Sequence, residues 1–225
     1  MDRARGRSLA AAAALVWAAA APARASRFIS TPSAETMPAG RYSVWQFGVY
    51  ESKGNKTWRT MNRLDLGAGG GVELGVLSVS PKGAQPDSWL NAQWQPVPET
   101  DRAPALSAGV WDLLRKAPFF GSKAAGPSPF LSAGKTLKRG ERYAKAGVTV
   151  GANRLDGVSG GLDVRFVKAA GAMLEFVPRN SRLKGADAWN AALYVWLGPW
   201  ARVRATRAGG DAMLDAFFTW KFGGA

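Results

Sequence analysis

Residues 212–222 read Ala-Met-Leu-Asp-Ala-Phe-Phe-Thr-Trp-Lys-Phe, and the alternation within this stretch decides the fold class. Side chains along a β-strand point to opposite faces in turn. One face of this strand would carry Leu214, Ala216, Phe218, Trp220 and Phe222. The opposite face would carry Asp215, Phe217, Thr219 and Lys221. The stretch therefore predicts a strand with one apolar face and one mainly polar face.

The same alternation recurs along the chain between clusters of turn-forming residues such as Gly69-Gly70-Gly71 and Pro81-Lys82-Gly83. We expect strands at 41–52, 56–67, 71–80, 88–97, 104–114, 128–138, 142–153, 157–168, 171–178, 187–197, 200–208 and 212–222. Short strands with regular turn signals predict an all-β barrel or sandwich. Twelve strands, an even number, are typical of an antiparallel up-and-down transmembrane β-barrel in bacteria. Ten strands are the alternative, because the region 104–138 is irregular.

The first 25 residues predict a signal peptide. Basic residues precede an apolar run from Leu9 to Ala21, and Ala23-Arg24-Ala25 matches the small-x-small pattern of a cleavage site. The alternative, a membrane anchor, is disfavoured because a spanning helix needs about 20 apolar residues. We expect a signal peptide over 1–25, an N-terminal lead-in over 26–40 and a single barrel over 41–225.

The composition excludes several kinds of chemistry. Cysteine and histidine are both absent, which removes thiolate chemistry, Ser-His pairs and the commonest zinc ligands. We expect no catalytic residue, no cofactor and no metal. The formal net charge of +14 favours polyanionic partners, and the export signal argues against nucleic acid. Lipopolysaccharide, anionic phospholipid and acidic polysaccharide are the polyanions available to an exported protein.

Alternation alone does not say which face of the barrel points outward. Two features favour a membrane barrel, with its apolar face outward, over a lipocalin-like soluble barrel. The first is a set of aromatic residues near strand ends, where interface girdles would lie: Trp45, Trp58, Tyr143, Trp189, Trp200 and Trp220. The second is the mixture of opposed charges on the other face, which resembles a filled polar lumen.

The charges predicted to face the lumen are Arg59, Arg63, Asp65, Glu73, Lys145, Asp163, Arg165, Glu175, Arg202, Arg204, Asp215 and Lys221. They are expected to form either a ladder of ion pairs that fills a narrow barrel or the lining of a weakly anion-preferring passage. Residues 116–129 are expected to form a long loop or an inserted plug. Lys135 falls on an apolar face, so it either extends toward the membrane interface or reveals an error in the predicted register.

Several short motifs resemble the YjbH-like family of outer-membrane barrels, which is associated with exopolysaccharide and biofilm loci. The motifs are a Thr31-Pro32 segment that leads through Pro38-Ala39-Gly40 into the first strand, Pro104–Asp112, Phe130–Lys135, Leu174-Glu175-Phe176 and Asn190–Leu193. The chain departs from the family at Leu113-Leu114-Arg115-Lys116, where a glycine-rich run is usual, and at Ala192, where glycine is usual.

The resemblance implies a short, single-barrel member in the bacterial outer membrane, with its signal peptide cleaved near Ala25. We expect a non-enzymatic protein, structural or channel-forming, linked to exopolysaccharide export or biofilm matrix. Its expected partners are outer-membrane lipid and lipopolysaccharide, with acidic polysaccharide or export machinery as further partners. The alternative function is a soluble periplasmic barrel that binds a lipid or another apolar ligand.

Overall fold

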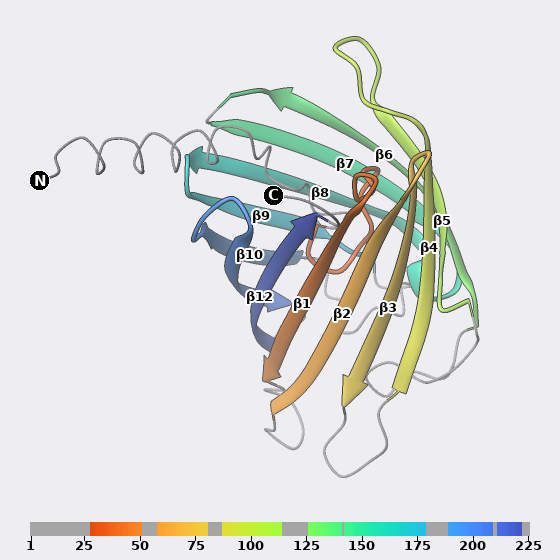
Figure 1. Ribbon diagram of the computed structural model, residues 1–225, viewed down its shortest axis with the longest axis vertical. Helices are drawn as coiled ribbons and strands as arrows, with labels where there is room; N and C mark the ends of the chain where they lie inside the picture. Colours follow the sequence, from red (N-terminus) through yellow and green to blue (C-terminus); the bar gives the residue numbers. More distant parts are fainter. Residues whose placement is uncertain are drawn as a thin grey trace, which may run out of the picture.

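The computed structural model describes residues 28–50, 58–80, 87–113, 126–140, 142–178, 189–208 and 211–221. They form a closed antiparallel barrel, shown in Figure 1. Its strands are β1 (Arg41–Tyr50), β2 (Trp58–Gly69), β3 (Val72–Ser80), β4 (Asp87–Val97), β5 (Ala105–Trp111), β6 (Ser128–Lys138), β7 (Tyr143–Gly151), β8 (Gly157–Val167), β9 (Ala170–Phe176), β10 (Trp189–Trp196), β11 (Ala201–Ala208) and β12 (Asp211–Lys221). A single 3-10 turn, η1 (Asn153–Leu155), separates β7 from β8. No helix among these residues is long and apolar enough to cross a membrane.

Each strand pairs with its neighbours in sequence, and β1 pairs with β12 to close the ring. The predicted all-β, twelve-stranded, up-and-down barrel is therefore confirmed. The largest boundary difference is in β5, which was predicted over 104–114 and spans Ala105–Trp111. The predicted signal peptide, residues 1–25, lies outside the described residues.

The two ends of the barrel differ in the length of their connections. At the end where β1 begins, which is the upper end in Figure 1, the connections are 70–71, 98–104, 139–142, 168–169 and 197–200. We call this the short-turn end. The longest connections, 112–127 and 177–188, belong to the opposite, long-loop end. At the short-turn end, Gly69, Gly70 and Gly71 have φ values of 96°, 58° and 76°, a conformation that favours glycine.

The outer face of the barrel is apolar and the inner face is largely polar. Leu193, Leu131 and Leu214 point outward and are 65%, 63% and 53% exposed. Glu175, Arg204 and other charged side chains point inward and are almost completely buried. This distribution is the reverse of that in a water-soluble barrel.

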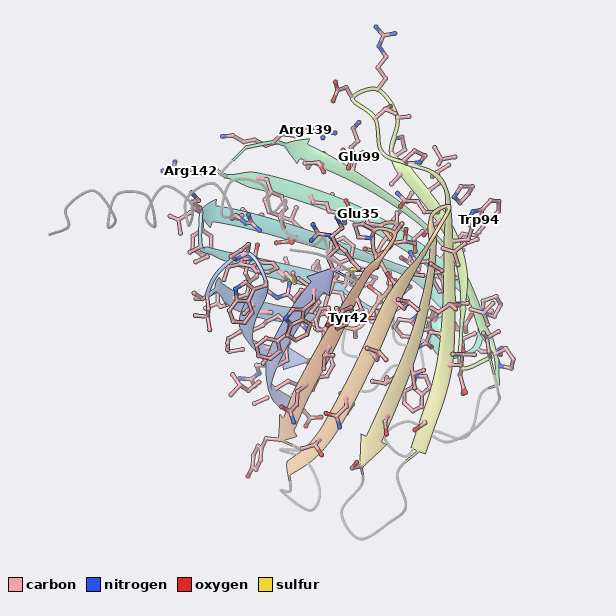
Figure 2. All side chains as sticks on the ribbon, in the orientation of Figure 1. Glu35, Tyr42, Trp94, Glu99, Arg139 and Arg142 are labelled. Carbon is pink, nitrogen blue, oxygen red and sulfur yellow. The ribbon has the colours of Figure 1, made fainter. Side chains whose placement is uncertain are left out.

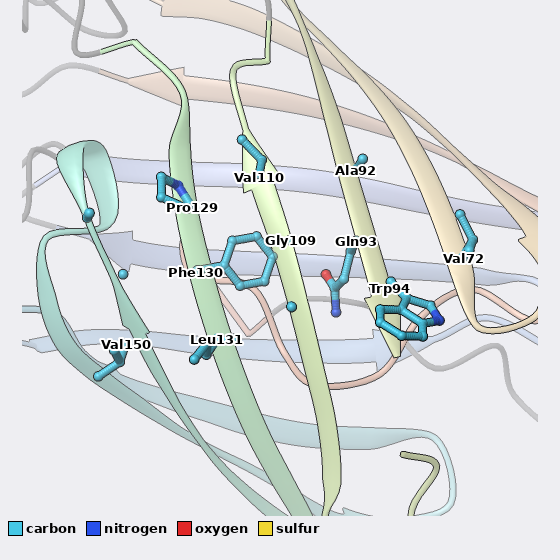
Figure 3. Close-up of a pocket in the computed structure, with 13 residues that line it drawn as sticks. Val72, Ala92, Gln93, Trp94, Gly109, Val110, Pro129, Phe130, Leu131 and Val150 are labelled. Carbon is cyan, nitrogen blue, oxygen red and sulfur yellow. The ribbon is translucent and has the colours of Figure 1, made fainter. Parts of the chain in front are cut away.

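An open apolar groove of about 680 Å³ runs across the outside of β3 to β7. Trp94, Leu131 and Val150 line it, as Figure 3 shows, together with small residues such as Ala92 and Gly109. The groove shows that the outer surface stays apolar where it is concave.

Part of the interior is filled by an apolar cluster on the wall formed by β12 and β1 to β4. The cluster consists of Trp45, Phe47, Met61, Leu77, Trp89 and Phe217. The Trp45 and Phe217 rings lie 4.4 Å apart between centroids. Packed aromatic side chains thus narrow the lumen on this side.

Candidate functional site: a lumen occupied by the N-terminal segment

Residues 28–37, which precede β1, lie inside the barrel, and we call them the plug segment. Phe28, Thr31, Ala34 and Met37 are all buried. Glu35 lies within the ring of strands in Figure 2, whereas Trp94 lies on its outside. Residues 28–37, part of the region predicted as an N-terminal lead-in, therefore occupy the lumen.

The plug segment wraps around the carboxylate of Glu175 on β9. The backbone N–H groups of Ile29, Ser30 and Thr31 donate to its oxygens over 2.8–3.3 Å. The Ser30 and Thr31 hydroxyls donate over 2.5 and 2.6 Å. Asn190 on β10 donates from the barrel wall over 2.8 Å. Successive N–H groups of this kind form a concave anion site, and here the anion is a side chain of the barrel itself.

A second set of contacts holds the other end of the plug segment. The Lys145 ammonium lies 2.5 Å from the Glu35 carboxylate. Glu73 on β3 accepts a hydrogen bond of 2.7 Å from the Met37 backbone N–H. Arg63 pairs with both Glu73 and Asp65, so this attachment is joined to a buried ion-pair network in the wall.

The backbone carbonyls of the plug segment are also bound by side chains of the wall. Gln93 donates to Ser33 O over 2.6 Å, and Thr149 donates to Pro32 O over 2.9 Å. Arg204 donates to Phe28 O over 2.8 Å while it pairs with Asp215. Buried backbone polar groups are costly when unpaired, so these contacts allow an irregular segment to stay inside the barrel.

Glycines on the inner face provide the space for the Phe28 ring. A Cβ at Gly161 would lie 2.4 Å from Phe28 Cγ, and one at Gly147 would lie 2.7 Å from Phe28 Cε2. A side chain at either position would therefore displace the ring. Polar residues in 30–36 and glycines on the inner faces of β7 and β8 were the available sequence signals for this site.

Residues from three of the five short motifs singled out in the sequence meet at the plug segment. Thr31, Glu175 and Asn190 come from different motifs, and both Thr31 and Asn190 donate hydrogen bonds to Glu175.

The structure places most of the predicted lumen charges inside the barrel. Those buried are Arg63, Asp65, Glu73, Lys145, Asp163, Glu175, Arg202, Arg204 and Asp215. Arg165 is half-buried, and Lys221 is exposed at the end of β12 rather than within the lumen. The side chain of Arg59 lies outside the described residues. Within the described part of the chain, no acidic cluster has the composition of a metal site.

The predicted interface aromatics divide between the two faces. Trp189, Trp200 and Trp220 are exposed on the outer surface near the ends of the barrel. Trp220 continues a row of stacked rings through Phe218 to Trp200, with centroids 5.8 and 6.2 Å apart. The side chain of Trp58 lies outside the described residues.

Trp45 and Tyr143 are corrections, because both point inward. Trp45 is 2% exposed in the apolar cluster, and the Tyr143 hydroxyl donates to Asp163 over 2.6 Å. On β1, Trp45 and Phe47 face inward while Gln46 faces outward, so position near a strand end misled the prediction. Each ring instead occupies the inner face set by the register of its own strand.

Lys135 lies on the outer face of β6, as its register predicted. Its ammonium group donates to the carbonyls of Thr100, Asp101 and Ala103 in the β4–β5 turn, over 2.6, 2.9 and 3.3 Å. The side chain therefore reaches past the apolar surface to the short-turn end, and the register is correct.

The segment 116–129, predicted as a loop or plug, falls mainly among residues 114–125, which lie outside the described residues. The lumen contacts that the structure does describe come from residues 28–37.

No family model matches the sequence, and no curated protein matches it. Among solved structures, the chain is similar to the outer-membrane protein Omp33 of Acinetobacter baumannii, with 10% identity, 81% of this chain and 98% of that chain covered, and a TM-score of 0.49. It is similar to the porin NanC, with 11% identity, coverage of 80% and 99%, and a TM-score of 0.46. It is also similar to an outer-membrane channel from Pseudomonas putida F1, with 12% identity, coverage of 85% and 100%, and a TM-score of 0.41.

Proposed function

We propose that the protein is a non-enzymatic outer-membrane β-barrel whose lumen is closed by its own N-terminal segment and conducts when that segment leaves. The observation that carries the membrane assignment is the inverted distribution of side chains, apolar outside and charged inside. The observation that carries the closed state is the burial of residues 28–37 within the ring of strands.

The outer surface favours lipid over water as its surroundings. Large apolar side chains are exposed on strands around the ring, including Leu64, Leu131, Val158, Leu193 and Leu214. Burying each such side chain is worth about 1.5–3 kcal/mol, so their exposure to water would be costly in sum. The soluble lipid-binding barrel proposed as an alternative would need the opposite arrangement.

The connections suggest an orientation. Outer-membrane barrels have short turns on the periplasmic side and longer loops outside the cell. The short-turn end would then face the periplasm, and the plug segment would enter the lumen from that side, because β1 begins there.

The inner wall supports a channel role once the plug segment has left. Its departure would leave Glu175, Lys145 and Arg204 without their plug partners. Charged groups without protein partners require water, so the vacated lumen would hydrate. The buried pairs Arg63–Asp65 and Arg204–Asp215 would remain as part of its lining.

We also propose, from the sequence resemblance, a role in exopolysaccharide export or biofilm matrix, with outer-membrane lipid and lipopolysaccharide as surrounding partners. Deletion of the gene, followed by measurement of secreted polysaccharide and biofilm mass, tests this role. Unchanged polysaccharide and biofilm would contradict it without affecting the membrane assignment.

The membrane and channel assignments are tested with the full chain and a variant that lacks residues 28–37. We expect both proteins in the outer-membrane fraction, with a gel mobility that shifts on heating. In planar bilayers the full chain should be mostly closed and the deletion variant should conduct steadily. Recovery in the soluble periplasm would contradict the membrane assignment. Equal conductance of the two proteins would contradict closure by the plug segment.

A further inference from the structure

The guanidinium of Arg202 is surrounded by aromatic rings inside the barrel. Arg202 is 2% exposed, and its Cζ lies 5.0 Å from the Trp45 centroid and 5.3 Å from the Phe217 centroid. The Tyr194 and Trp196 rings each lie 5.6 Å away. These contacts stabilise the charge but provide no hydrogen-bond acceptor in the plane of the guanidinium.

One edge of this guanidinium is free of partners. Arg202 Nε and Nη2, which point in the same direction, have no hydrogen-bond partner among the described residues. Arg63 and Arg204 are the matched comparison, because the Nε of each donates to a carboxylate, that of Asp65 or Asp215. The Nε–Nη2 edge carries two parallel N–H donors and can bind two oxygens of a carboxylate or phosphate side by side.

Arg165 brings a second cation to the same place. Its Cζ lies 5.8 Å from the Trp196 centroid, so the two guanidinium groups contact a shared ring. Its Nε also lacks a hydrogen-bond partner. Asp163, which is on β8 with Arg165, accepts hydrogen bonds from the Tyr143 and Tyr194 hydroxyls rather than from either arginine.

The site lies near the short-turn end of the barrel. Arg202 is opposite Trp196, the last residue of β10, and Arg165 is opposite Tyr143, the first residue of β7. Arg165, Tyr143 and Trp196 are only half-buried, whereas Arg202 is fully buried. The cluster is therefore exposed at its margin and contains a buried cation with free donors at its centre.

We propose that Arg202 and Arg165 form a binding site for an oxyanion, a carboxylate or a phosphate group carried by a ligand that arrives from the short-turn end. A buried cation without an acceptor is costly, and a bound anion would supply both the charge and the hydrogen bonds. Because rings contact the guanidinium of Arg202, the ligand meets its edge, which favours a group with two oxygens over a spherical ion. The site goes beyond the proposed channel function and does not require the plug segment to move.

The test uses the full chain folded in detergent micelles, so that its outcome is independent of conductance. Glucuronate supplies a carboxylate, inorganic phosphate supplies the alternative oxyanion, and glucose is the neutral control, all at constant chloride. Because Trp45 and Trp196 contact Arg202, we expect a saturable change in tryptophan fluorescence with at least one oxyanion and none with glucose. Calorimetric titration of the same samples measures the affinity.

Variants separate the site from general charge effects. Arg202→Gln should weaken binding by about tenfold or more, and Arg202→Lys, which keeps the charge but lacks the two-donor edge, should also weaken it. Arg165→Gln disrupts the same site at a less buried residue and should also weaken binding. Arg207→Gln is the matched control, because Arg207 is on the outer face of the same strand. The heat-dependent gel shift verifies that each variant is folded.

Binding to glucuronate alone would identify a carboxylate ligand, and binding to phosphate alone would identify a phosphorylated one. The absence of saturable binding to both oxyanions would overturn the proposal. So would an affinity that is unchanged in folded Arg202→Gln and Arg165→Gln, or one that Arg207→Gln lowers equally.

Discussion

The Lys145 ammonium lies 2.5 Å from the Glu35 carboxylate, and this buried ion pair joins the wall of the barrel at β7 to the plug segment. The Phe28 ring, at the other end of the plug segment, also contacts Lys145, with its centroid 5.6 Å from Nζ. One lysine therefore contacts the segment at two points that are adjacent in space but separated in sequence.

Reversal of one charge in this pair should release the plug segment. Lys145→Glu would place two carboxylates together in the interior, and breaking a buried pair costs about 3–5 kcal/mol. We expect Lys145→Glu and Glu35→Lys each to raise the conductance of the full chain in planar bilayers, and the double variant to return it toward the closed level. Arg139→Glu, which reverses the half-exposed partner of Glu99, is the control and should have little effect. Two single variants that stay closed would show that the pair does not hold the segment.

Neutralisation of Glu175 should weaken the attachment of residues 29–31, near the start of the plug segment. In Glu175→Gln one acceptor oxygen is replaced by an NH₂ group, which would face the N–H groups of the plug segment. Hydrogen bonds to a charged group contribute about 1.5–3 kcal/mol each, so we expect at least about 3 kcal/mol of lost stability for the plugged state.

The chain contains no cysteine, so Ser33→Cys, at a side chain that is 2% exposed, introduces a single thiol that reports on plug release. In the Ser33→Cys protein the thiol should react slowly with a thiol reagent, and it should react faster when Glu175→Gln is added. Asp101→Asn, at an exposed carboxylate in the β4–β5 turn, should leave the reaction rate unchanged. Equal rates in all three proteins would argue against Glu175 as the anchor.

A side chain at Gly161 should displace Phe28, whereas one at the neighbouring Gly160 should not. A Cβ at Gly161 would lie 2.4 Å from Phe28 Cγ, while the nearest atom to a Cβ at Gly160 would be Gly147 O at 3.5 Å, an ordinary contact. We expect Gly161→Val to increase conductance and Gly160→Val to have no effect. Phe28→Ala, combined with Gly161→Val, should relieve the clash. Closed channels in Gly161→Val would indicate that the ring moves aside within the plug.

If the outer face contacts lipid, a charged residue placed on it should destabilise the barrel, and the loss of stability should be larger near the middle of the bilayer than at its surface. Leu193, on β10, is 65% exposed, and Leu197, in the turn that follows, is 67% exposed. Leu193 lies in the middle of β10, so in lipid Leu193→Arg should lower the free energy of unfolding by about 2–4 kcal/mol, whereas Leu197→Arg, beyond the end of the strand, should lower it little. Chemical unfolding of the protein from lipid vesicles measures both. A water-exposed barrel would tolerate the two substitutions equally.

Much of the barrel follows from local pattern. Leu214, Ala216 and Phe218 alternate with Asp215 and Phe217 because successive side chains of a strand point to opposite faces. This property belongs to each strand alone, so strand positions and most inward charges could be predicted before any pairing was known. The register of Lys135 was predicted on the same basis.

The alternation was less informative on β1. Trp45 and Phe47 face inward and Gln46 faces outward, and the lumen is apolar there because Phe217 and Trp89 pack against them. Phe217 comes from β12, at the other end of the chain, and Trp89 comes from β4. The polarity of β1 alone therefore did not reveal which of its faces points into the lumen.

The sequence by itself determined an all-β chain of twelve strands with two chemically distinct faces, because strand formation and alternation depend on residues that are close in sequence. Only the tertiary structure decided what fills the lumen. Thr31 meets Glu175 across 144 residues of sequence, and Glu35 meets Lys145 across 110. Such contacts exist only after β1 and β12 close the ring, because closure creates the buried interior in which these charges require partners.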